Sequence, residues 1–231
     1  MSTPLSTSGT ECPEARALGK LQETQLLCVS SAIGSSPSSY IDLPSGEKIL
    51  SQKTLKVLGF HIGCHPGMAE QVTHLKRKFR GRSWIIRNLK RAGLQPDDLI
   101  GLYKTLVRPV IDYMAAVYHP MLTLEQRKEL EKLQRNVLKT IYGYKVSYAC
   151  ALELSGIQSL EERRQDCFDR FAIKLANNKE YEEWLPRTKF TGYDLREELI
   201  YDELFASTDR LRNSPLYAMR RRLNEIYLYQ K

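Results

Sequence analysis

The sequence of 231 residues contains no uninterrupted apolar run of about 18 residues, the length that a membrane-spanning helix needs. Its first residues, MSTPLSTSGTECPEAR, also lack the apolar core of a secretory signal peptide. Five cysteines are present, an odd number without any C-x-x-C pair, so the sequence indicates neither a disulfide framework nor a four-thiolate zinc site. We therefore expect an intracellular protein, cytoplasmic or nuclear, that is not secreted.

The sequence has little that would carry catalysis. It lacks a glycine-rich phosphate loop, and no Ser or Cys stands in a recognisable nucleophile motif. The acidic pair Asp97-Asp98 follows Gln-Pro and opens an apolar stripe, which is typical of acids in the first turn of a helix. Four residues look at first like metal ligands, but their spacing fits no common zinc pattern and Gly63 and Pro66 interrupt them: His61, Cys64, His65 and His74. We expect no catalytic residue, no metal and no cofactor, and we interpret this cluster as a strand end with incidental histidines.

Positive charge is present in excess and is unevenly distributed. The net charge is +8 and the pI is about 9.2, and residues 61–150 contain sixteen basic and seven acidic residues. The run KRKFRGRSWIIRNLKR, Lys76 to Arg91, has eight basic residues and no acid. Because like charges repel along a helix, a polyanion partner would stabilise this run, although a solvated basic face is the simpler alternative. The candidate nucleic-acid-binding residues are Lys76, Arg77, Lys78, Arg80, Arg82, Trp84, Arg87, Lys90 and Arg91.

The pattern of the chain predicts an α+β fold that is mostly α. Residues 1–17 are rich in Ser, Thr and Pro, as in a disordered leader. Short β-prone runs between about residues 24 and 62 predict three or four strands of a small antiparallel sheet, within a first region of residues 18–65. A helical region of residues 66–180 and a helical or irregular extension of residues 181–231 follow.

Several helices can be bounded from the sequence. An apolar stripe predicts one amphipathic helix from Val72 to Leu89, and Pro96 opens a second that continues to Tyr118 with a kink near Pro109. The capping boxes Thr123-Leu124-Glu125-Gln126 and Ser159-Leu160-Glu161-Glu162 start two more. We expect Phe171 and Ala172 to face inward from the last of these, a short helix between the two, and another from Asp194 to Phe205.

Five ordered segments between residues 54 and 164 resemble a known family. They are LKVLGFHIG, IIRNLKRAGL, LIGLYKTLVRPVIDYMAAVYHP, LEKLQRNVLKTIYG and SLEERR. In this order they are similar to the end of the palm and the thumb of reverse transcriptases from non-LTR retrotransposons of the LINE type. GKLQETQLLCVSS and NSPLYAMRRRLN extend the similarity to about residues 18–226.

The resemblance implies binding without polymerisation. Enzymes of that family hold two magnesium ions on three Asp residues, two of them in an aromatic-x-Asp-Asp hairpin, and this sequence has no such motif. The resemblance implies a thumb-like helical bundle in which Lys76 to Arg91 lies against the backbones of RNA, DNA or their hybrid. It also implies that the strand turn with Lys56, Leu58 and Gly59 supports a primer end. We therefore expect a catalytically incomplete reverse transcriptase fragment that requires no magnesium and takes no small-molecule substrate.

Three alternatives stay open. The chain is a helical protein-interaction module that binds the missing palm or another protein at an exposed sheet edge; or it is an unselected gene fragment; or it is a nuclease built on His61, His65 and His74.

Overall fold

The computed structural model describes residues 25–27, 40–42, 46–64, 67–188, 199–202 and 205–228. These residues are mostly helical and include two antiparallel sheets of two strands each, so the predicted α+β, mostly α, fold class is confirmed. The chain divides into one unit of Met1–Val57 with Ile62–Pro66 and a second of Leu58–His61 with Gly67–Lys231. The expected leader, residues 1–17, lies outside the described residues.

The strands form two separate pairs instead of one small sheet. β1 (Tyr40–Asp42) runs antiparallel to β2 (Lys48–Leu50), with Ile41 opposite Ile49, and β3 (Thr54–Val57) pairs with β4 (Phe60–Gly63). Leu58 and Gly59 join β3 to β4 with φ angles of 49° and 83°. Positive φ at both central residues is the pattern of a type I′ turn, whose twist matches that of a two-residue hairpin.

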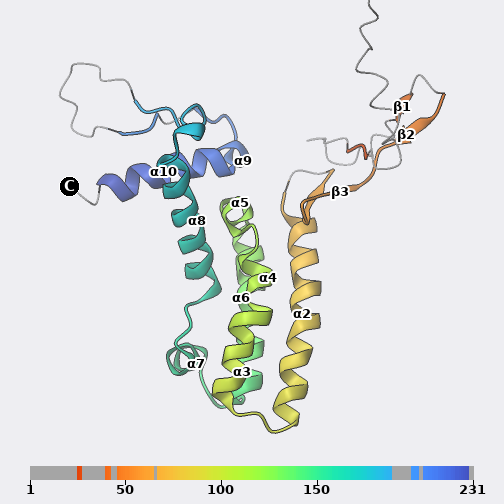
Figure 1. Ribbon diagram of the computed structural model, residues 1–231, viewed down its shortest axis with the longest axis vertical. Coiled ribbons are helices and arrows are strands. Elements are labelled where there is room, and N and C mark those ends of the chain that lie inside the picture. Colours follow the sequence, from red (N-terminus) through yellow and green to blue (C-terminus); the bar gives the residue numbers. More distant parts are fainter. Residues whose placement is uncertain are drawn as a thin grey trace, which may run out of the picture. The chain divides into compact units, whose positions relative to one another are not determined.

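The second unit is built from helices (Figure 1). Its first four helical segments are α2 (Ala69–Arg91), α3 (Pro96–Leu102), the π-helix η2 (Tyr103–Val107) and α4 (Pro109–Asp112). They are followed by α5 (Ala115–Tyr118), the 3-10 helix η3 (His119–Met121), α6 (Leu124–Tyr142) and α7 (Tyr148–Ser155). The described helices after these are α8 (Leu160–Ala176), the 3-10 helix η4 (Lys179–Tyr181), α9 (Asp209–Arg212) and α10 (Pro215–Leu228).

Both capping boxes form as the sequence predicts. The Thr123 hydroxyl accepts from the Gln126 amide at 3.2 Å, while the Gln126 side chain accepts from the Thr123 amide at 3.0 Å. Ser159 and Glu162 repeat this reciprocal pair at the start of α8, again at 3.2 and 3.0 Å. These local hydrogen bonds satisfy amides that a helix start leaves unpaired, and they fix where α6 and α8 begin.

The helix expected from Pro96 to Tyr118 is broken, not only kinked. Pro109 lacks an amide hydrogen, and just before it the Arg108 amide donates to the Tyr103 carbonyl five residues back, at 2.9 Å, which defines the π-helix. After α4 the chain is extended at Tyr113 and left-handed at Met114, with φ of 54°. The break therefore lies four to five residues beyond the proline, at two residues with no local sequence signal.

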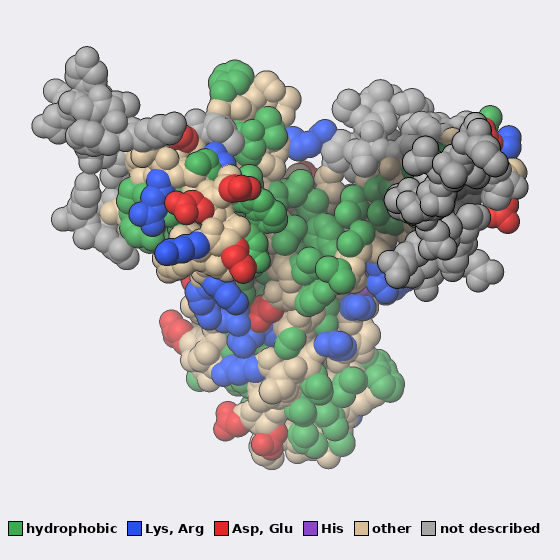
Figure 2. Space-filling model, turned by 45° about the horizontal axis from the view of Figure 1, so that its top comes forward, with side chains coloured by type: hydrophobic (Ala, Val, Ile, Leu, Met, Phe, Trp, Pro, Cys, Tyr) green, Lys and Arg blue, Asp and Glu red, His purple; other side chains and the backbone are tan. Residues whose placement is uncertain are grey.

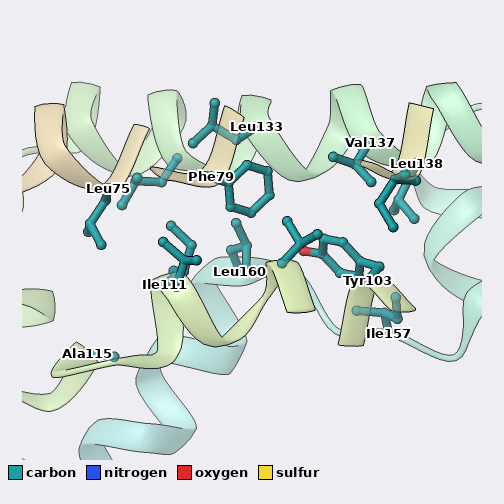
Figure 3. Close-up of a cluster of buried hydrophobic side chains, with 14 of the residues drawn as sticks. Leu75, Phe79, Tyr103, Ile111, Ala115, Leu133, Val137, Leu138, Ile157 and Leu160 are labelled. Atoms are coloured by element: carbon teal, nitrogen blue, oxygen red, sulfur yellow. The ribbon is translucent and has the colours of Figure 1, made fainter. Parts of the chain in front are cut away.

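The larger hydrophobic core joins α2, η2, α4 and α6. Figure 3 shows Phe79 of α2 pointing between Leu133 of α6 and Tyr103 of η2, and the Phe79 and Tyr103 rings meet edge to face at 6.3 Å. The buried Tyr103 hydroxyl donates to the Gln134 side chain at 2.5 Å, and the Gln134 amide in turn donates to the Gln158 carbonyl at 2.9 Å. This chain of hydrogen bonds satisfies polar groups that would otherwise be costly to bury. Phe79, Leu133 and Val137 belong to the same buried cluster, which packs α2 along α6.

A second hydrophobic cluster lies between α8 and α10. Phe168 and Ala172 of α8 are buried there with Met219 and Leu223 of α10. The sequence expectation was correct for Ala172 and wrong for Phe171, which is 39% exposed. Of the helix expected from Asp194 to Phe205, the structure describes residues 199–202 and 205, where Tyr201 makes an antiparallel bridge with Arg187. None of the described helices combines the length and apolar character needed to cross a membrane.

Candidate nucleic-acid interface

A groove of about 880 Å³ runs between α2 and α6. Four of the nine residues predicted to bind nucleic acid line it: Lys76, Arg80, Trp84 and Arg87. Their spacing of four, four and three residues places them along one face of α2. Ile86, Leu133 and Val137, buried between the two helices, also line the groove. The amphipathic pattern of α2 thus orients both the core stripe and the basic stripe beside it.

The other wall comes from α6 and the residues that follow it. Lys132, Asn136 and Thr140 recur every four residues on the groove side of α6, together with Lys139, and Tyr144 follows the helix end at Gly143. The sequence expectations did not include these residues. Their signal is weak because α6 mixes five basic residues with three acidic ones, so the sequence alone does not show which of its cations lie beside α2.

The groove is strongly positive. Among the described residues, five Lys or Arg side chains and one carboxylate line it, and that carboxylate, Glu129, is already paired with Lys76 at 3.0 Å. The side chains of the other four cations make no ion pair or hydrogen bond with the residues that the structure describes: Arg80, Arg87, Lys132 and Lys139. Such a cluster of unpaired cations in a groove concentrates the potential that attracts an anionic chain.

The other candidate residues on α2 lie elsewhere. Arg82 donates to the Leu106 carbonyl of η2 at 2.7 Å, and Lys90 donates to the Ile141 carbonyl in the last turn of α6 at 2.5 Å. Both side chains therefore stabilise helix packing. Arg77 lies 3.4 Å from the His74 ring, and Lys78 and Arg91 are exposed but do not line the groove. The basic run of the sequence is thus divided between binding surface and structural contacts.

The residues assigned to primer-end support lie on the β3–β4 hairpin. Leu58 is 80% exposed, and its carbonyl accepts a hydrogen bond from the Tyr113 hydroxyl. A side chain at Gly59 would approach the Tyr113 ring at 3.6 Å, in a backbone conformation that favours glycine. Lys56 is exposed within β3. The structure thus holds the turn at Leu58 and Gly59 against Tyr113.

The histidine cluster is only partly described. The His61 and His74 rings lie 3.9 Å apart, and the His61 amide donates to the Gln71 side chain at 2.9 Å, whereas His65 lies outside the described residues. Within the described ranges no three ligating side chains are grouped as a metal site. Asp97 and Asp98 lie in the first turn of α3, as predicted.

A second pocket, of about 410 Å³, also contains basic residues, but most of them are paired. It is lined by Arg127, which contacts Glu161 at 3.2 Å, and by Arg222, which donates to Asp169 and Glu225 at 2.9 to 3.0 Å. His119 at its wall donates from Nε2 to the Gln165 side-chain oxygen at 2.9 Å, and burial lowers the pKa of His119 to about 4. The α2–α6 groove therefore offers the larger accessible positive charge.

Comparison with known proteins gives no relative: no family model, no curated protein and no solved structure matches the chain.

Proposed function

We propose that the chain binds the phosphate backbone of RNA or DNA in the groove between α2 and α6, as a non-catalytic, thumb-like part of a retroelement reverse transcriptase. The observation that carries this proposal is that four groove cations have no partner among the described residues: Arg80, Arg87, Lys132 and Lys139. They come from two helices, and Lys and Arg side chains of this kind contact phosphate groups without reading the base sequence. The absence of an aromatic-x-Asp-Asp motif from this sequence favours binding over polymerisation.

Two matched double variants test the site. In Arg80→Gln with Arg87→Gln, two groove cations are lost; in Arg77→Gln with Lys78→Gln, two exposed cations of the same helix are lost outside the groove. We expect the groove variant to bind a labelled oligonucleotide roughly tenfold to fiftyfold more weakly at 0.1 M salt, and to reduce the slope of log K against log salt by about 2. The control variant should change both quantities much less. Equal losses in the two variants, or no loss in either, would show that the charge is only a solvated face.

A protein-binding role is the second candidate, and surface hydrophobicity favours it. Figure 2 shows hydrophobic side chains in a broad area across the middle of the face that it presents, with Lys and Arg side chains around it. Leu106 and Tyr113 are 41% and 51% exposed. A large exposed apolar area often marks a protein interface. Binding to a protein partner would be insensitive to salt and to the Arg80 and Arg87 substitutions, which separates this candidate from the first.

A further inference from the structure

Two large aromatic side chains at the α2–α6 groove are mostly exposed to solvent. Trp84 is 59% exposed and Tyr144 is 86% exposed, and both line the groove. Trp84 extends from the α2 face that carries Arg80 four residues before it and Arg87 three residues after it. Tyr144 follows Gly143, whose φ of 96° ends α6 and turns the chain. Exposed rings beside unpaired cations need an explanation beyond core packing.

Phosphate contacts alone do not explain these rings. Cations suffice to hold a duplex by its backbone, and the bases of a duplex are stacked on each other, so their faces are not available. In a single strand the faces are available, and proteins that bind single strands combine a basic groove with aromatic side chains on which successive bases stack. The α2–α6 groove has both elements on its two walls: Trp84 with Arg80 and Arg87 on one, and Tyr144 with Lys139 on the other.

We propose that this groove binds a short single-stranded segment of RNA or DNA, with its phosphates at the groove cations of α2 and α6 and its bases stacked on Trp84 and Tyr144. The inference rests on the proposed function and adds the strandedness of the ligand and the role of the two rings. Asn136, exposed between Lys132 and Thr140 on the α6 wall, offers an amide donor and acceptor to a base edge or a sugar. An acidic peptide can pair with the cations but has no bases that could stack on Trp84 and Tyr144.

A comparison of the affinities for a single strand and for a duplex separates the role of the two aromatic rings from that of the cations. Fluorescence anisotropy is measured with a labelled oligonucleotide of about 12 nucleotides and with the corresponding duplex. We expect Trp84→Ala with Tyr144→Ala to weaken single-strand binding roughly tenfold or more while changing duplex binding by about twofold or less. Trp184→Ala is the matched control, because Trp184 is 58% exposed but does not line the groove, and it should change neither affinity. The circular dichroism spectrum of each variant is compared with that of the unmodified chain to check that the variant folds.

Tryptophan fluorescence gives a direct signal of stacking. The chain has two tryptophans, so Trp184→Phe leaves Trp84 as the single tryptophan reporter. Stacking on a base should quench Trp84 when the oligonucleotide is added, whereas an abasic oligonucleotide of equal length should bind through its phosphates with little quenching.

The outcomes distinguish this inference from the function on which it rests. If the ring variants bind single strands as well as the unmodified chain does, while Arg80→Gln with Arg87→Gln binds poorly, stacking is refuted and backbone binding stands. If neither pair of substitutions affects binding, both proposals fail. If polyglutamate displaces the oligonucleotide as efficiently as unlabelled oligonucleotide does, the groove is a site for acidic peptides and the inference is overturned.

Discussion

Arg163 and Arg164 are neighbours in α8, yet their guanidinium groups have opposite surroundings. Arg163 donates to one carboxylate oxygen of Asp112 from two nitrogens, at 3.1 and 3.2 Å, and these bonds raise its pKa. The Arg164 side chain is fully buried, and none of its three side-chain nitrogens has a hydrogen-bond partner among the described residues. Burial lowers the pKa of Arg164 because the charged form loses its hydration. Adjacent residues of the same type thus contribute to stability in different ways.

Substitution by methionine should separate these two arginines. Arg164→Met removes a buried charge that has no hydrogen-bond partner among the described residues, and it keeps an unbranched side chain, so we expect the free energy of unfolding to rise or to stay within about 1 kcal/mol. Arg163→Met removes two hydrogen bonds to the Asp112 carboxylate, which keeps only its ion pair with Arg108 at 3.6 Å, so the free energy of unfolding should fall by about 1–3 kcal/mol. Urea unfolding followed by circular dichroism measures both. A larger loss for Arg164→Met than for Arg163→Met would contradict this ranking.

The Glu131 carboxylate of α6 accepts hydrogen bonds from the first amides of α8 and so links the two helices. The two Glu131 oxygens accept from the Leu160 and Glu161 amides at the start of α8, each at 3.2 Å, and one of them also accepts from the Tyr148 hydroxyl. Those amides carry the positive end of the helix dipole, so a negative charge there is favourable. Burial and the contact with Glu131 raise the pKa of Tyr148, which keeps its hydroxyl protonated as a donor. The position of α8 is therefore determined partly by α6.

Removal of this charge should destabilise the bundle. Glu131→Gln keeps the shape of the side chain but removes its negative charge from the start of α8, so we expect a loss of about 1–2 kcal/mol in the free energy of unfolding. Glu129→Gln is the matched control on the same helix, because Glu129 is half exposed and its pair with Lys76 should contribute about 0.5 kcal/mol or less. Thermal unfolding of both variants tests this, and equal losses would refute a special role for Glu131.

Local chemistry explains what the sequence could predict about these elements. Thr123 and Ser159 mark helix starts because a capping box involves only four consecutive residues, and Val72, Leu75, Phe79 and Ile86 are buried as their periodicity indicates. The break at Tyr113 and Met114 has no such local pattern, and the Tyr113 side chain there donates to the carbonyl of Leu58, 55 residues away in the sequence. The candidate site was predictable only on its α2 wall. The basic stripe of α2 is visible in the composition of the sequence, whereas Lys132 and Lys139 of α6 lie beside it only when the two helices pack.

Within the second unit, α8 connects the two hydrophobic clusters. Leu160 at its start is buried in the larger cluster, and Phe168 and Ala172 are buried in the one formed with α10. One helix cannot easily unfold at one end while its other end stays packed, because helix formation is cooperative over such lengths. The two clusters should therefore unfold together, as a single cooperative domain does.

The two tryptophans make this cooperativity measurable. Trp84 lies on α2 beside the larger cluster, and Trp184 precedes Leu185, which is buried in the second cluster. In Trp184→Phe the fluorescence reports on Trp84, and in Trp84→Phe it reports on Trp184. In each variant we expect the urea midpoint from fluorescence to equal the urea midpoint from circular dichroism. A lower midpoint from Trp184 fluorescence alone would show that the α8–α10 cluster unfolds independently.

The origin of the groove from two helices links ligand binding to folding. Its unpaired cations belong to α2 and α6, which are separated in the sequence by residues 92–123, so the cluster exists only where those helices are packed. A ligand that contacts both walls binds the folded chain in preference to the unfolded one, and at a free concentration of about 100 times Kd it adds about 2.7 kcal/mol to the free energy of unfolding. An isolated α2 peptide keeps its basic residues but loses this linkage. A polyanion that contacts both walls of the groove therefore also holds α2 and α6 together.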